Sequence, residues 1–176
     1  MRTCITRRKY YTKPMKILPY TPEYWPQMWA IMQPVFADGE TYPYAMDISE
    51  NGAQEMWLEK TQAQFVAIDD TETVLGTYYI KPNQPTLAAH IANCGYLVSE
   101  SARGKGIAGL MCKHSQITGR ELGFRGLQFN LVVSTNTGAL RLWQKHGFDI
   151  IGTIPGAFKS RSQGYVDAHI MFKSLI

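Results

Sequence analysis

The stretch Val98–Ala108 constrains the fold more than any other part of the sequence. It follows a strand-like stretch at 92–99, leads into a long helix predicted over about 106–122, and has glycines at 104 and 106. Backbone N–H groups at the start of a helix lack intrahelical partners and carry a partial positive charge, so they suit phosphate oxygens. Glycine lets the backbone approach such a ligand closely. An anion-binding turn and a plain connecting turn explain Gly-Lys-Gly equally well, but a P-loop is excluded because its Gly-x-x-x-x-Gly-Lys-[Ser/Thr] spacing is missing.

The periodicity of the apolar residues predicts the other elements. Further helices are expected at about 25–36, 49–60 and 137–146, and strands at 16–20, 65–68, 74–80, 92–99, 127–134, 148–154 and 165–172. The order is strand, two helices, three strands, helix, strand, helix, two strands. We therefore expect an α/β fold with a mixed, mostly antiparallel, twisted sheet of six to seven strands, and about four helices on both faces.

The helix over 106–122 has one apolar face, which we expect to point inward. This face comprises Ile107, Leu110, Met111, His114 and Ile117. A histidine on such a face is usually a hydrogen-bonded core residue, and that is our interpretation of His114. The three cysteines, Cys4, Cys94 and Cys112, have no paired or metal-like spacing, so we expect buried free thiols for the last two and no metal site.

Charge is distributed unevenly along the chain, whose net charge is +4. Five basic residues and no acidic ones fall within residues 1–14, and the remainder carries 13 basic and 14 acidic side chains. We expect 1–14 to be a basic, disordered leader and 15–176 to be a single domain. Because the excess charge belongs to the leader, we expect no nucleic-acid partner. No apolar run approaches the roughly 20 residues of a membrane span. Unpaired thiols fit a reducing compartment, so we expect a cytoplasmic protein.

Two motifs resemble those of the GCN5-related N-acetyltransferases (GNAT). Arg103-Gly104-Lys105-Gly106-Ile107-Ala108 resembles the family's Arg/Gln-x-x-Gly-x-Gly/Ala pyrophosphate loop, and Asn136–Phe148 resembles its Asn-x-x-Ala-x-x-x-Tyr-x-Lys-x-Gly-Phe motif. Both occur in the right order, separated by one helix and one strand. Closer similarity links 75–83, 93–98 and 129–132 to yeast azetidine-2-carboxylate N-acetyltransferases, and 156–172 to the phosphinothricin acetyltransferase branch.

The resemblance implies how acetyl-CoA, the expected co-substrate, is held. The backbone of Arg103–Ala108 is expected to bind the pyrophosphate. Leu97 and Val98 are expected to offer backbone groups to the pantetheine arm and the acetyl carbonyl. Asn136 is expected to contact the same arm, although it also suits the N-cap of the following helix. Many family members have, at the position of Trp143, a tyrosine that protonates the leaving thiolate. Indole is no acid, so we expect Trp143 to pack against CoA or the core.

The resemblance also implies where the acceptor amine lies. The phosphinothricin branch has a glutamate base at the position of Asn93, whereas the azetidine-acetylating relatives have asparagine. Asparagine cannot take up a proton at neutral pH, so the base is absent, displaced or replaced by water. We expect Asn93 to orient the amine and Asn130 to hold a carboxylate. Glu40 and Tyr42 lie in a loop expected to cover the substrate, and a solvent-exposed carboxylate is the simpler interpretation of Glu40.

The implied activity is transfer of acetyl from acetyl-CoA to the amine of a small, amino-acid-like substrate by direct attack in a ternary complex. Two alternatives remain open: acetylation of proteins or peptides, and non-catalytic acyl-CoA sensing. The family often forms dimers, so a homodimer is one expected state. The predicted partners are therefore acetyl-CoA and a small amine, with no metal, nucleic acid or membrane.

Overall fold

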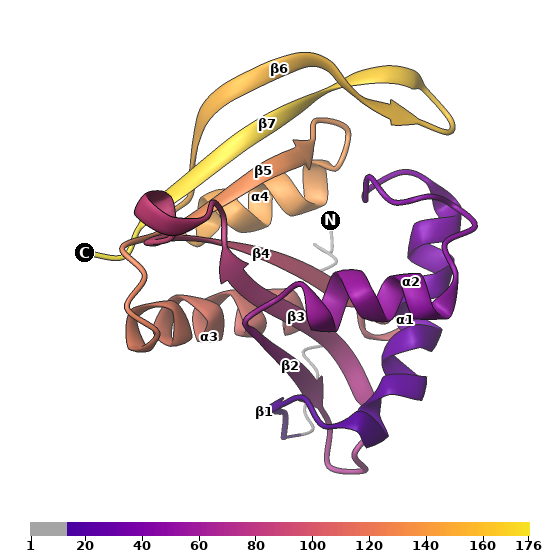
Figure 1. Cartoon of the computed structure of the whole chain (residues 1–176). Coiled ribbons are helices and arrows are strands. Elements are labelled where there is room, and N and C mark those ends of the chain that lie inside the picture. The colour runs from indigo at the N-terminus through magenta and orange to yellow at the C-terminus, as the bar shows by residue number, and fades with distance from the viewer. Residues whose placement is uncertain (1–13) are drawn as a thin grey trace, which may run out of the picture.

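The computed structural model describes residues 14–176, so the expected leader lies outside it apart from Pro14. One seven-stranded sheet runs in the order β1-β2-β3-β4-β5-β7-β6, with helices on both faces (Figure 1). The elements are β1 (Lys16–Pro19), α1 (Trp25–Asp38), α2 (Glu50–Gln54), β2 (Ala63–Ile68), β3 (Val74–Pro82), β4 (Ile91–Val98), α3 (Ile107–Glu121), β5 (Gly126–Val133), α4 (Thr137–Lys145), β6 (Asp149–Ser160) and β7 (Gly164–Ser174). The predicted fold class and element order are confirmed.

The sheet opens between β4 and β5. These strands are the one parallel pair within residues 14–176, and they pair only at Ile91 with Gly126 and at Ala92 with Leu127. Beyond Ala92 the two strands have no backbone pairing with each other. The pairing of β5 with β7 is also interrupted, by an irregularity between Phe129 and Val132. Such a bulge bends its strand and redirects side chains, here toward the opening.

Two hydrophobic cores lie on opposite faces of the sheet. Helix α3 covers one face, where Tyr78, Met111 and Leu127 are fully buried. Helices α1 and α2 cover the other, where Met28 and Trp57 are nearly inaccessible (Figure 1). Successive residues of a strand point to opposite faces, so adjacent residues of β3 and β4 enter different cores. None of the helices within residues 14–176 has the length and apolar character to cross a bilayer.

The inward face of α3 differs from the predicted one. Ile117 is 54% exposed, whereas Ile107, Met111, Ser115 and Thr118 are buried. The expectation for Ile117 was wrong because two hydroxyl residues occupy the inward positions of the last turns. Ser115 is compatible with burial because its hydroxyl donates to the carbonyl of Cys112, which removes the cost of an unpaired polar group. Cys94 and Cys112 are buried free thiols, as predicted.

His114 is held by a tyrosine of the sheet. Its Nδ1 lies 2.6 Å from the hydroxyl oxygen of Tyr78. Burial lowers the pKa of His114, because the charged imidazolium loses solvation. This fits the interpretation of His114 as a hydrogen-bonded core residue.

We expect stability to fall on acidification partly through His114. The unfolded chain takes up its proton first as the pH falls, so this stabilisation is complete above the ordinary pKa of about 6.5 and is lost as the pH falls through the lowered folded-state pKa. His114→Gln should therefore reduce the pH dependence of the free energy of unfolding in this window, measured by urea titration. The pKa of His146 is lowered too, so part of the slope remains. An unchanged slope in His114→Gln would contradict this account.

Candidate active site

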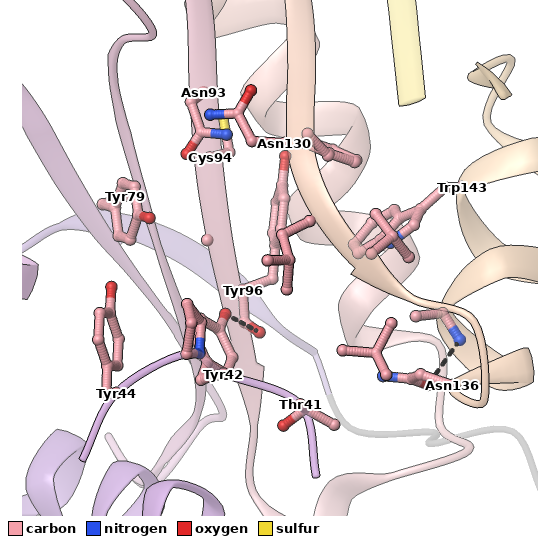
Figure 2. Close-up of a pocket in the computed structure, with 17 residues that line it drawn as sticks. Thr41, Tyr42, Tyr44, Tyr79, Asn93, Cys94, Tyr96, Asn130, Asn136 and Trp143 are labelled. Atoms are coloured by element: carbon pink, nitrogen blue, oxygen red, sulfur yellow. Dashed lines mark hydrogen bonds between the residues drawn. The ribbon is translucent and has the colours of Figure 1, made fainter. Parts of the chain in front are cut away.

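Two hollows meet where β4 leaves β5. The inner cavity, of about 260 Å³, lies between β4, β5 and the loop 41–44 (Figure 2). The outer groove, of about 560 Å³, runs along the end of β4 to the start of α3. The residues that line both are Thr41, Tyr42, Tyr96, Asn136, Ala139 and Trp143. A ligand in the groove would therefore touch the same wall as a ligand in the cavity.

The turn before α3 faces the outer groove with its backbone exposed. Gly104 and Gly106 have φ of +74° and +88°, and no atom lies within 4 Å of the position that a Cβ would take on either. Helix α3 begins at Ile107, so its first N–H groups have no intrahelical acceptor. The left-handed conformation favours glycine at both positions. This geometry provides a strip of N–H donors beside open space, which suits a phosphate group.

The groove brings together most of the residues predicted to hold acetyl-CoA. Its walls include Leu97, Val98, Arg103, Gly104, Gly106, Ile107, Ala108, Asn136 and Trp143. Lys105 is not among the lining residues. Gly104, Gly106 and Gly109 also have the Gly-x-Gly-x-x-Gly spacing of dinucleotide-binding turns. Dinucleotide-binding turns lie in mostly parallel sheets, whereas β4 and β5, which flank α3, are the one parallel pair within residues 14–176, and β4 pairs antiparallel with β3.

Hydrogen bonds connect four amide residues at one end of the inner cavity, and two of them, Asn93 and Asn130, line it. Asn93 donates from Nδ2 to the backbone oxygen of Gln128 (2.8 Å), and Gln128 donates from Nε2 to Oδ1 of Asn130 (2.9 Å). Asn130 in turn donates from Nδ2 to Oδ1 of Asn83 (2.5 Å). Figure 2 shows Asn93 and Asn130 side by side above the cavity. The bulge in β5 places Asn130 here, so the structure brings together the two residues predicted to bind the acceptor.

The lining of the inner cavity is uncharged. Among residues 14–176 it contains four tyrosines, two asparagines at one end and a third near the groove, and no carboxylate, imidazole, ammonium or guanidinium group. Burial raises the pKa of Tyr42, Tyr79 and Tyr96, and it raises the pKa of the Cys94 thiol to about 12. These groups are therefore protonated at neutral pH. None of them can take up a proton as a resting anion.

Tyr42 holds the covering loop onto β4. Its hydroxyl donates to the backbone oxygen of Tyr96 across 2.9 Å, on the strand edge that has no β5 partner (Figure 2). Because Tyr42 lines both hollows, its ring forms part of the boundary between them. A place beside the substrate stays a prediction for Tyr42.

Glu40 lies outside the inner cavity. Its Oε2 accepts from the hydroxyl of Ser160 (2.6 Å) and its Oε1 from the backbone N–H of Ser162 (2.8 Å). The Ser160 hydrogen bond is the main cause that lowers the pKa of this carboxyl. Both oxygens are thus used to tie the loop after α1 to the turn between β6 and β7. Glu40 therefore forms a contact between these two segments, and its role as a substrate contact stays a prediction.

Asn136 and Trp143 combine structural contacts with positions in both hollows. Oδ1 of Asn136 accepts from the N–H of Ala139 (3.1 Å). Asn136 is therefore the N-cap of α4, which was the alternative role expected from the sequence. Trp143 is 8% exposed and packs against Tyr96 and Phe129, with ring centroids 4.9 and 5.0 Å away. Its packing role agrees with the sequence-based expectation.

Some lining residues were not predicted from sequence. Tyr79 is one of them, and its ring is accommodated because Gly95 stands opposite it on β4. A Cβ on Gly95 would lie 2.5 Å from that ring. Alternation along 74–80 could have placed Tyr79 on one face of the strand. Its position beside the cavity depends on the pairing register of β3 and β4.

The comparisons with known proteins agree with this geometry. The model of the Acetyltransferase (GNAT) family matches residues 25–148. N-acetyltransferase aca1 of Schizosaccharomyces pombe is 35% identical over 148 residues, covering 75% of this chain and 71% of the relative.

Two solved structures have similar folds. A GCN5-related N-acetyltransferase from Kribbella flavida has a TM-score of 0.86 and 34% identity, and the match covers 91% of this chain and 97% of that one. A GNAT superfamily phosphinothricin acetyltransferase from Sinorhizobium meliloti, solved in complex with AcCoA, has a TM-score of 0.81 and 17% identity over 91% and 88% of the two chains. The second likeness concerns the fold alone.

Proposed function

Because this chain belongs to the GNAT acetyltransferase family, we propose that it acetylates the amine of a small, amino-acid-like molecule bound in the inner cavity. Its coarser activity, acetyl-CoA-dependent N-acetyl transfer, follows from family membership. The observation that carries the finer proposal is the uncharged cavity of about 260 Å³, joined to the groove and ending at Asn93 and Asn130. Pockets for drug-sized ligands begin at about 300 Å³, so this volume suits a molecule the size of an amino acid.

Acetyl-CoA, as co-substrate, supplies an activated thioester carbonyl. In our proposal, the N–H groups of the Gly104–Ala108 turn bind its pyrophosphate, and the open space over both glycines leaves room for the phosphate oxygens. Leu97 and Val98 border the groove on the stretch of β4 that has no β5 partner. Strand alternation directs the backbone groups of Val98 to this free edge, where they can hydrogen-bond the pantetheine arm and orient the thioester toward the cavity. The backbone groups of Leu97 face its β3 partner Thr77 instead.

Asn93 orients the acceptor amine in this proposal. The Nδ2 of Asn93 is used by Gln128, and its Oδ1 accepts no hydrogen bond from any group within residues 14–176. An amine N–H can donate to that oxygen, which directs the nitrogen lone pair away from Asn93. Asn130 belongs to the same amide cluster and supports the acceptor's carboxylate end.

Proton transfer then depends on the acceptor and solvent. The amine nitrogen attacks the carbonyl carbon, the bond to sulfur breaks, and the amine proton passes to water, since none of the lining residues in the described part of the chain is a base. The thiolate can depart unprotonated because the ordinary pKa of a thiol is only about 8.5. Trp143 and Tyr42 act here as walls that hold the reacting groups together and exclude excess water.

Removing the Asn93 amide tests this arrangement. We expect Asn93→Ala to lower kcat/KM for the preferred amino acid about tenfold, the effect of losing about 1.4 kcal/mol of hydrogen bonding, with KM for acetyl-CoA unchanged. Initial rates of thiol release measure both constants. Asn51→Ala, at an exposed site on α2, is the matched control and should behave as wild type. Equal constants for Asn93→Ala and Asn51→Ala would count against the proposed acceptor site.

A further inference from the structure

We propose that Lys81 is a specificity-determining residue that pairs with the carboxylate of the acceptor at the mouth of the inner cavity. The proposal rests on the proposed function and deepens it: the preferred acceptors are free α-amino or imino acids that carry a negative charge. Lys81 is not itself among the residues that line the cavity.

The strand register brings Lys81 beside the amide cluster. Lys81 on β3 is paired directly with Asn93 on β4, as Tyr79 is with Gly95. Directly paired residues of antiparallel strands point to the same face, with Cβ atoms about 4.5–5.5 Å apart. Tyr79 and Asn93 both line the cavity, so Lys81 continues the cavity face of β3. Asn83, two residues further along, reaches Asn130 from the same side.

The ammonium group of Lys81 is directed toward the cavity residues by an aromatic ring. Its Nζ lies 5.5 Å from the centroid of the Tyr79 ring, within the range of a cation–π contact. Lys81 is half-buried, and no carboxylate within residues 14–176 forms an ion pair with it. It therefore holds a positive charge next to the cavity that the described part of the chain does not neutralise.

A charged acceptor requires such a group. A carboxylate that enters an uncharged cavity loses its solvation free energy. Hydrogen bonds from neutral amides compensate for only part of that loss. Asn93 and Asn130 provide amides but no charge. Lys81 provides the charge beside them, so the amide cluster and the ammonium together form a complementary site for a carboxylate. A neutral amine of the same size would lack this attraction.

The test compares each amino acid with its carboxamide, which differs only in the charge. For Lys81→Met we expect KM to rise at least about tenfold for the amino acid and to change less than about threefold for the carboxamide, with KM for acetyl-CoA unchanged. Lys81→Arg should restore a low KM for the amino acid, and Lys81→Glu should make the carboxamide the better acceptor. Lys159→Met is the matched control, since Lys159 also lies over a tyrosine ring, at 5.9 Å, in the β6–β7 hairpin.

The outcomes separate the two proposals. Suppose that wild type acetylates amino acids. If Lys81→Met then raises KM equally for the amino acid and the carboxamide, or raises it for neither, the role of Lys81 is overturned while the proposed function stands. If wild type acetylates no amino acid, both are overturned. Lys81→Gln, which keeps a polar side chain of similar length, repeats the test should the methionine variant fold poorly. If Lys81→Gln raises KM for the amino acid alone, the proposal is supported. An equal rise in KM for the amino acid and the carboxamide contradicts it.

Discussion

Replacing Gly106 by aspartate is expected to lower kcat/KM for acetyl-CoA about 100-fold, corresponding to a loss of about 2.7 kcal/mol. Gly106 has φ of +88°, and the space where its Cβ would lie is open. We propose that this space receives the pyrophosphate. A carboxylate there would exclude and repel the phosphates, and it would remove hydrogen bonds to charged groups that contribute about 1.5–3 kcal/mol each. KM for the acceptor should change little, because Gly106 does not line the inner cavity.

The other end of the same helix provides the matched control. Gly123 follows α3, has φ of +84°, and likewise has no atom within 4 Å of its Cβ position. Gly123→Asp therefore introduces the same backbone strain and the same side chain, but away from the groove. We expect it to keep near wild-type kinetics. If both variants lose the same activity, strain rather than phosphate binding is responsible, and the assignment of the turn to the pyrophosphate is contradicted.

The second large effect concerns pH. We expect kcat/KM for the acceptor to rise about tenfold per pH unit until the pKa of its own amine, which is about 10 for an alkylamine such as a lysine side chain. A protonated amine has no lone pair, and burial keeps the tyrosines and Cys94 of the cavity protonated. No lining group from residues 14–176 can therefore deprotonate the bound amine. Only the fraction of acceptor that arrives neutral reacts, and this fraction grows with pH.

A comparison of acceptors whose amines differ in pKa tests this prediction. The pH at which the rate levels off should shift with the pKa of the acceptor amine. Rates of thiol release between about pH 6 and 11 would measure it, with acetyl-CoA saturating, because amine pKa values run from about 8 for a peptide α-amino group to about 10 for an alkylamine. A common plateau near neutral pH for every acceptor would instead reveal a base on the enzyme, and it would contradict the assignment of proton removal to solvent.

The fold could be predicted because its local signals agree with one another. The periodic apolar residues of 74–80 and 106–122 define a strand and a helix, and the glycine turn between strand and helix fixes their junction. The error at Ile117 has a physical cause. Ser115 and Thr118 were counted as polar, yet hydrogen bonding allows them to be buried in its place.

The site could be predicted from sequence only where all of the residues involved lie in one continuous segment. The turn at Arg103–Ala108 is local, so its sequence describes it well. The amide cluster combines β3, β4 and a bulge in β5, and neither the bulge nor the register is encoded by a local pattern. The hydrogen bonds of Glu40 could not be predicted for the same reason: its partners, Ser160 and Ser162, lie 120 residues away or more.

Thiol release from acetyl-CoA by the wild-type chain, scanned across free amino acids, imino acids and short peptides, tests the central claim most directly. The account predicts rapid release with one or more free amino or imino acids and little with peptides, because the inner cavity is small and lined by the loop 41–44. The N-acetylated product should appear in step with the thiol. Preference for peptides, or no release with any amine despite measurable binding of acetyl-CoA, would contradict a small-molecule acetyltransferase.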